Sequence, residues 1–138
     1  MEAMQELGLS VNFRRLRNVA YATAEPVSED SDQYQVVICG RVVCTPATLR
    51  AGQTSRDRAE QTAGSINACL DAGACGRDIL CDTAAARLMV RGAPVVDVFP
   101  EDMAVSGQDL TEMLVHARKT LEYAMWADWL SARCGAEL

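Results

Sequence analysis

The sequence is poor in the residues that usually carry chemistry. Among its 138 residues there are one histidine, His116, and one lysine, Lys119, and aromatic side chains make up only 5%. Neither G-x-x-x-x-G-K-[ST] nor G-x-G-x-x-G occurs, which argues against a P-loop and against a dinucleotide-binding turn. Glu112 precedes His116 by one helical turn, but a catalytic pair needs a third group and a pocket. Enzymatic activity is therefore the less favoured class.

Long hydrophobic runs are also missing. The first residues, MEAMQELGLSVNFRRLRNV, carry acids where a secretory signal has bases, and no apolar run follows them. No stretch approaches the roughly 18 apolar residues that span a bilayer. We therefore expect a cytoplasmic protein without a membrane partner.

The six cysteines do not have the spacing of a metal site. No C-x-x-C pair occurs, and the closest two, Cys39 and Cys44, are separated by four residues without a clear second pair. We expect no metal and no cofactor, and reduced thiols that pack as small hydrophobes. Cys75 is the candidate reactive thiol, because it precedes an expected helix start, where the helix dipole favours a thiolate.

The charge balance argues against nucleic acid as a partner. The chain has 19 acidic and 13 basic residues, a net charge of −6. Residues 55–91 can be interpreted as a helix-turn-helix, but Asp78 and Asp82 offset the arginines of its second helix. A nucleic-acid-associated regulator is therefore only a second alternative.

The chain length predicts a single domain over residues 1–138, and hydrophobic periodicity predicts a mixed α+β protein. We expect a short β-sheet, from residues 34–45 and 95–99, packed by three or four helices. The first strands flank a turn at Gly40-Arg41, with one longer strand bulged at Gly40 as the rival interpretation. The expected helices are Ser10 to about Ala24, Thr54 or Ser55 to Ala72, Arg77 to Val90, and Gln108 to Ala132. A competing interpretation makes residues 87–91 a strand paired with residues 95–99.

The long C-terminal helix is amphipathic with apolar residues on two faces. One stripe has helical spacing and is expected to face the core; it comprises Leu110, Met113, Leu114, Ala117, Leu121, Ala124 and Met125. Val115, Trp126 and Leu130 fall roughly opposite this stripe, with Trp129 between the two. Tryptophan is enriched where interfaces are energetically important. These four residues are the candidate interface.

The function that we expect is therefore a small acidic protein-binding or assembly module: an adaptor, or chaperone-like or inhibitor-like. In size, charge and the strand-loop-helix arrangement of residues 95–132, the chain resembles bacterial secretion chaperones and acidic immunity and inhibitor proteins. The resemblance includes no diagnostic motif and transfers no residue role. It implies a homodimer formed through the last helix or an exposed strand. The first alternative is a small cysteine-dependent enzyme or redox sensor.

Overall fold

The computed structural model describes residues 21–137, and the side chains of residues 21–127. Residues 10–20 of the helix expected from Ser10 to Ala24 lie outside this range. The expected end of that helix is wrong, because Ala24 pairs with Val36 in an antiparallel sheet. The strand that contains Ala24 ends at Pro26, and a loop follows it.

The described strands form two antiparallel sheets of three strands each, where a single sheet was expected. The first sheet has the order β1-β2-β3 and comprises β1 (Thr23–Pro26), β2 (Tyr34–Ile38) and β3 (Arg41–Cys44). The second has the order β4-β5-β6 and comprises β4 (Ile79–Asp82), β5 (Arg87–Val90) and β6 (Ala93–Asp97). Each sheet is built only from strands that follow one another along the chain.

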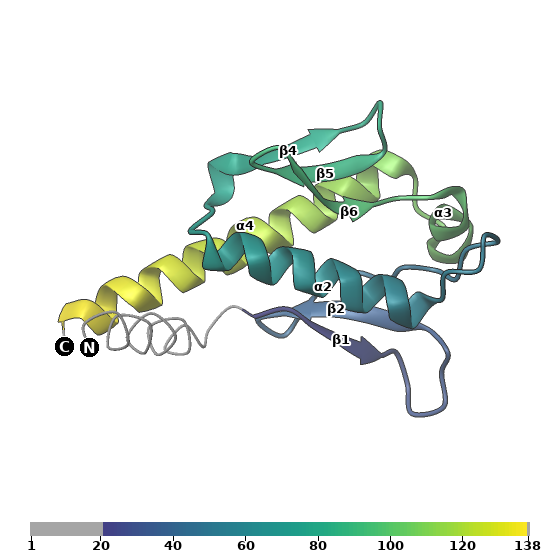
Figure 1. Ribbon diagram of the computed structural model, residues 1–138, viewed down its shortest axis with the longest axis horizontal. Coiled ribbons are helices and arrows are strands. Elements are labelled where there is room, and N and C mark those ends of the chain that lie inside the picture. The colour runs from purple at the N-terminus through teal and green to yellow at the C-terminus, as the bar shows by residue number, and fades with distance from the viewer. Residues whose placement is uncertain (1–20, 138) are drawn as a thin grey trace, which may run out of the picture.

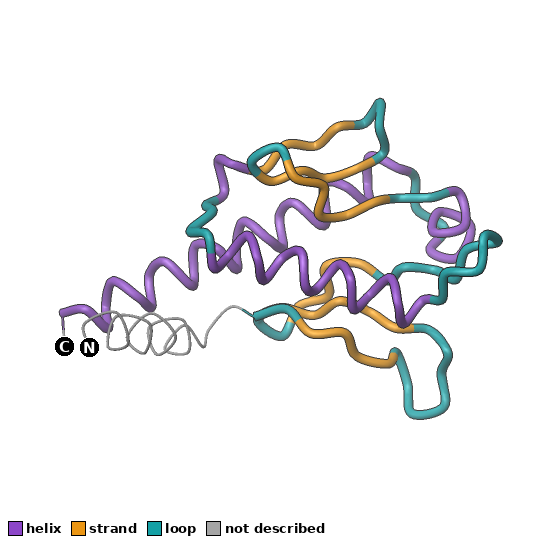
Figure 2. Tube along the Cα trace, in the orientation of Figure 1, coloured by secondary structure: helices purple, strands orange, loops and turns teal. Residues whose placement is uncertain are grey.

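Three α-helices and one 3-10 turn complete the part of the chain that the structure describes. They are α2 (Ser55–Asp71), η1 (Gly76–Asp78), α3 (Pro100–Ser106) and α4 (Leu110–Glu137). The mixed α+β class is confirmed. Helices α2 and α4 run between the two sheets, and the C-terminal half of α4 extends beyond both of them (Figures 1 and 2).

The β2–β3 hairpin and the β5–β6 hairpin each have two turn residues with positive φ. Cys39 and Gly40 have φ of 52° and 72°, and Arg91 and Gly92 have φ of 52° and 81°. Two successive residues in this region form a type I′ turn, whose twist matches that of the flanking strands. The expected hairpin is confirmed, but its turn is Cys39-Gly40 instead of Gly40-Arg41. The rival bulge at Gly40 is wrong; the register shift lies between Val36 and Val37.

Helix α2 has the expected position and the expected buried face. The Thr54 side chain accepts a hydrogen bond from the Asp57 N–H at its first turn. Its apolar positions at helical spacing are all buried: Ala59, Ala63, Ile66 and Leu70. Past the last turn, Gly73 adopts a φ of 82°, the left-handed conformation in which a helix commonly stops.

The helix expected over Arg77–Val90 is wrong, because this segment forms β4 and β5. Leu88 and Val90 are buried while Met89 between them is half exposed, which is the period of a strand. The competing interpretation, a strand paired with the next one, is confirmed, although β6 spans Ala93–Asp97 instead of residues 95–99. The helix α3 that follows was not expected; Pro100 occupies its first turn.

Helix α4 contributes one wall of the core. It contacts β3, β4 and β5, whereas α2 covers β1 and β2 and lies beside β6. The stripe expected to face inward does so. Five of its residues are buried, namely Leu114, Ala117, Leu121, Ala124 and Met125, and Leu110 and Met113 pack against them.

Candidate functional site

The outer face of α4 carries large apolar side chains in contact with solvent. Trp126 is 55% exposed, Tyr123 is 39% exposed and Val115 is 37% exposed. The Tyr123 and Trp126 rings are neighbours, with centroids 6.1 Å apart. Tryptophan is highly buried on average in folded proteins, so this exposure is the unusual feature of the surface. We call Val115, Tyr123 and Trp126 the α4 outer patch.

The strand β3 is fastened to one flank of this patch. The Arg41 guanidinium lies over the Tyr123 ring, 3.9 Å from its centroid, a cation–π contact. About two turns earlier on the helix, Nε2 of His116 lies 2.7 Å from the backbone oxygen of Val42. These contacts hold the exposed Tyr123 in a defined position, so the patch is preformed.

On the other flank, α4 lies against β4 and η1. The Cys81 thiol donates to the backbone oxygen of Leu114 at 3.9 Å. Arg118 and Glu122 form an i,i+4 ion pair at 3.4 Å, and the Glu122 side chain lies 3.5 Å from where a Cβ would stand on Gly76. The outer patch is therefore bordered by a strand on each side.

The structure places two of the four predicted interface residues on this surface. Val115 and Trp126 are both exposed and share one helix face, as their spacing predicted. The side chains of Trp129 and Leu130 lie outside the described residues, although their backbone is helical. Sequence reasoning missed Tyr123, although Tyr123 precedes Trp126 by three residues and helical spacing makes the two rings neighbours.

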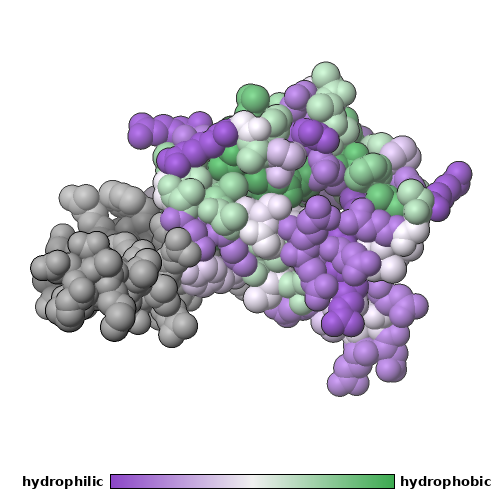
Figure 3. Space-filling view, in the orientation of Figure 1, coloured by the Kyte–Doolittle hydropathy of each residue, from purple (hydrophilic) through white to green (hydrophobic). Residues whose placement is uncertain are grey.

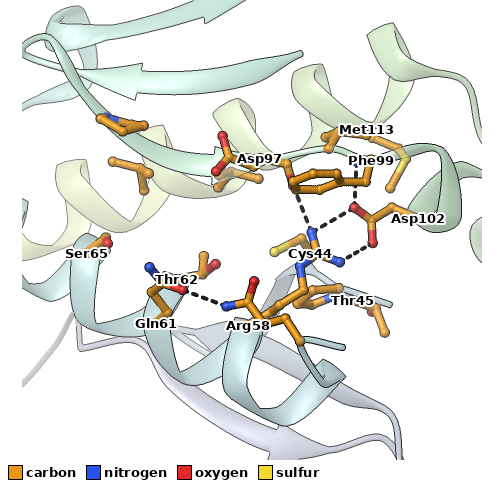
Figure 4. A pocket seen from close by; sticks show the side chains of 16 residues that line it. Cys44, Thr45, Arg58, Gln61, Thr62, Ser65, Asp97, Phe99, Asp102 and Met113 are labelled. Atoms are coloured by element: carbon orange, nitrogen blue, oxygen red, sulfur yellow. Dashed lines mark hydrogen bonds and ion pairs between the residues drawn. The ribbon is translucent and has the colours of Figure 1, made fainter. Parts of the chain in front are cut away.

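The chemically richest cluster lies elsewhere, around a cavity of about 210 Å³ between α2, β6 and α3 (Figure 4). Its central group is Arg58, which is 6% exposed. Arg58 Nη1 donates to Asp102 Oδ1 at 2.6 Å and Nη2 donates to Asp102 Oδ2 at 2.9 Å. The same guanidinium donates to the backbone oxygens of Ala47 and Asp97. Arg58 therefore ties α2 to the β3–α2 loop, the end of β6 and α3.

Asp102 is equally well satisfied. Its carboxylate accepts from the backbone N–H groups of Ala47, at 2.7 Å, and Phe99, at 2.8 Å, as well as from Arg58. Burial alone would raise the pKa of Asp102, but the hydrogen bonds from Arg58 and the two N–H groups lower it below its usual value. An arginine and a carboxylate that saturate each other are suited to holding a fold together, not to binding an anion or moving a proton. Sequence reasoning missed this pair, because 44 residues separate its members.

Cys44 lines the same cavity, but its thiol is a poor nucleophile. Burial, followed by the charge of Asp102, raises its pKa to about 12, with Arg58 opposing the shift. The thiolate is the reactive form of cysteine, so little of it exists near neutral pH. Among the residues that line this cavity there is no histidine to act as a base. The thiol and the buried ion pair of this cavity are therefore not arranged for nucleophilic catalysis.

The predicted reactive thiol, Cys75, lies at the start of η1. Its sulfur donates to Asp78 Oδ2 at 3.5 Å, and its N–H donates to the same oxygen at 2.9 Å. Activated cysteines lie beside cations or at helix N-termini. Here the immediate partner is a carboxylate, and η1 is only three residues long, so the expected helix dipole is missing.

A second hollow lies between the C-terminal half of α2 and β6. It has a volume of about 350 Å³ and is lined mainly by small apolar side chains, with Ser65 and Arg91 as its polar members. Figure 3 shows apolar residues over this part of the molecule and hydrophilic residues over the β1–β2 loop. Arg91 donates hydrogen bonds to Asp78 and to the carbonyls of Ala72 and Gly73.

A metal-binding cluster and a membrane-spanning helix are both absent from the part of the chain that the structure describes. No three histidine, cysteine, aspartate or glutamate side chains in the described part of the chain gather as a metal site. No helix within that part is long and apolar enough to span a membrane.

Comparison with known proteins gave no match to a family model, to a curated protein or to a solved structure.

Proposed function

We propose that this protein is a protein-binding or assembly module, of adaptor, chaperone-like or inhibitor-like kind, and that it self-associates as a homodimer through the outer face of α4. The observation that carries the proposal is the division of α4 into two apolar faces. One face lies in the core, where Leu121 is fully buried, and the opposite face leaves Trp126 55% exposed. A helix that is apolar on two sides is suited to packing against a partner with the second side.

The features around the patch support an interface more than a catalytic centre. Tyr123 is held in place by Arg41, which reduces the entropy that binding would cost. Lys119 and Glu122 lie among the apolar side chains and supply charges of both signs. Aromatic anchors surrounded by polar groups are typical of protein–protein interfaces.

We also propose that the protein acts in the cytoplasm. Cys44, Cys69, Cys75 and Cys81 carry free thiols in the structure. Thiols persist in a reducing compartment and tend to oxidise outside it.

The first test is the mass of the protein in solution as a function of concentration. Sedimentation or light scattering of the full chain is expected to show a dimer, and Trp126→Ala is expected to shift it toward monomer. Leu80→Ala is the matched control, because Leu80 on β4 is 62% exposed and lies off the α4 outer patch. A wild-type protein that stays monomeric, or a dimer that Trp126→Ala leaves unchanged, contradicts the proposal.

A further inference from the structure

A row of four residues runs along the outer face of α4 with the spacing of a coiled-coil seam. Val115, Lys119, Glu122 and Trp126 are separated by four, three and four residues. At about 100° per residue they fall within roughly 60° of helix circumference, opposite the buried stripe. The row spans about 16 Å along the helix. We call these four residues the outer seam.

All four residues are accessible on the folded protein. Val115 and Trp126 are exposed as given above, Lys119 is exposed, and the Glu122 side chain remains 40% exposed. The seam therefore has an apolar residue at each end and two opposite charges in the middle.

This order of residues is complementary to itself only when the second copy runs in the opposite direction. When two such helices pack antiparallel about a two-fold axis midway between Thr120 and Leu121, position i faces position 241 − i. Val115 then packs against Trp126 of the other copy, and Lys119 meets Glu122. Such pairs correspond to the layers of an antiparallel coiled coil. A two-fold axis forms each pair twice, as an isologous interface requires.

In a parallel arrangement in register, residues of like charge would face each other. Lys119 would then face Lys119 and Glu122 would face Glu122, so both central layers would be repulsive. Like charges that face each other across an interface are unfavourable and select against that arrangement. The charges of the seam thus specify both the partner and its direction.

Resting on the proposed function, we propose that the partner of the α4 outer patch is a second copy of this chain, packed antiparallel so that Val115 meets Trp126 and Lys119 meets Glu122. The occupant is the chain itself because the row is self-complementary in apolar groups and in charge. Dimer formation then covers the exposed indole in both copies.

Charge reversal tests this arrangement. Lys119→Glu alone, or Glu122→Lys alone, converts both central pairs from attraction to repulsion, and we expect the dimer dissociation constant to rise on the order of tenfold at low salt. The double variant restores both pairs with the charges exchanged and is expected to dimerise about as well as wild type. Added salt should reduce the effect of each single change.

Mixing the two single variants gives a positive signal. Each alone has two repulsive pairs, whereas a heterodimer of Lys119→Glu with Glu122→Lys has two attractive pairs, so the mixture is expected to form the heterodimer. Arg56→Glu is the matched control for Lys119→Glu, because it makes the same change in net charge on α2, where the Arg56 side chain is 63% exposed. Thermal melts of the diluted proteins separate an effect on folding from an effect on association.

The outcomes distinguish this arrangement from the proposed function. A dimer that Trp126→Ala dissociates but that neither charge reversal weakens overturns the antiparallel register and leaves self-association through α4 standing. A dimer that the double variant fails to restore also overturns the register. A protein that is monomeric at every concentration, or that associates only with a different protein, overturns both.

Discussion

The buried pair of Arg58 and Asp102 leads to a quantitative prediction for stability. Asp102 is 2% exposed and accepts four hydrogen bonds, two from Arg58 and one each from the N–H groups of Ala47 and Phe99. Asp102→Ala removes the acceptor and leaves a guanidinium buried without its counter-charge. Breaking one side of a buried ion pair costs about 3–5 kcal/mol.

That cost is a large part of the free energy of unfolding of a typical folded protein, which is about 5–15 kcal/mol. We therefore expect Asp102→Ala to lower the free energy of unfolding by about 4 kcal/mol, measured by urea titration with far-ultraviolet circular dichroism. Asp97→Asn is the matched control. Its carboxylate pairs with Arg87 at 3.2 Å on the surface, with 44% of the Asp97 side chain exposed, so its loss should cost under about 1 kcal/mol.

Replacing both partners tests whether the cost of Asp102→Ala comes from the buried charge that it leaves unpaired. Arg58→Met with Asp102→Leu leaves no charge unpaired, so this double variant should be more stable than Asp102→Ala. If Asp102→Ala costs no more than Asp97→Asn, the pair does not stabilise the fold in the way that its geometry indicates, and the reasoning is refuted.

The same pair predicts how stability depends on pH. The folded pKa of Asp102 lies below its unfolded value, so the unfolded chain binds the proton more readily. Its contribution is therefore complete above the unfolded pKa, about 3.9, and is lost as the pH falls toward and through the folded pKa. Asp102→Asn should flatten this acid limb of the stability curve.

Two further predictions concern single side chains. At pH 8, iodoacetamide should modify Cys44 roughly a thousandfold more slowly than an ordinary exposed thiol, because the pKa of Cys44 is about 12. Peptide mapping by mass spectrometry measures the rate. Rapid modification of Cys44 in the folded state would contradict this prediction. Leu121→Ala should cost about 2–5 kcal/mol of folding stability, because the side chain is fully buried; a urea titration giving less than about 1 kcal/mol would contradict its place in the core.

Elements with an unambiguous local signal were predictable from the sequence. Helix α2 has a capping threonine, four buried positions at helical spacing and a terminal glycine, and each of these operates over a few residues. The inward stripe of α4 was predictable for the same reason, and so was the exposure of Val115 and Trp126, because one helical period determines which residues share a face.

The segment of β4 and β5 was misread because its apolar residues fit two periods. Leu80, Ala84 and Leu88 recur at helical spacing, but Leu88 and Val90 also alternate with Met89. The alternation prevailed because Arg91 and Gly92 both adopt positive φ and close a tight hairpin onto β6. A turn that requires a left-handed arginine has little local signal, since residues other than glycine seldom adopt that conformation.

The features that could not be predicted are those made by contacts distant in sequence. Arg58 reads as one of several surface arginines, and only the fold buries it beside Asp102. The contact of Arg41 with the Tyr123 ring likewise joins residues 82 positions apart. Hydrophobic periodicity carries no information on which residues of different elements meet.

The arrangement of these contacts makes folding separable from the proposed association. Arg58 joins α2, the end of β6 and α3 through hydrogen bonds to Ala47, Asp97 and Asp102, which all lie outside α4. The outer seam lies on the side of α4 opposite Leu121 and contributes nothing to the core. A partner that binds only the folded chain stabilises it by mass action, in proportion to the logarithm of its concentration. The core pair therefore contributes to the stability of the isolated fold, whereas the proposed dimer through the outer seam would make that stability rise with protein concentration.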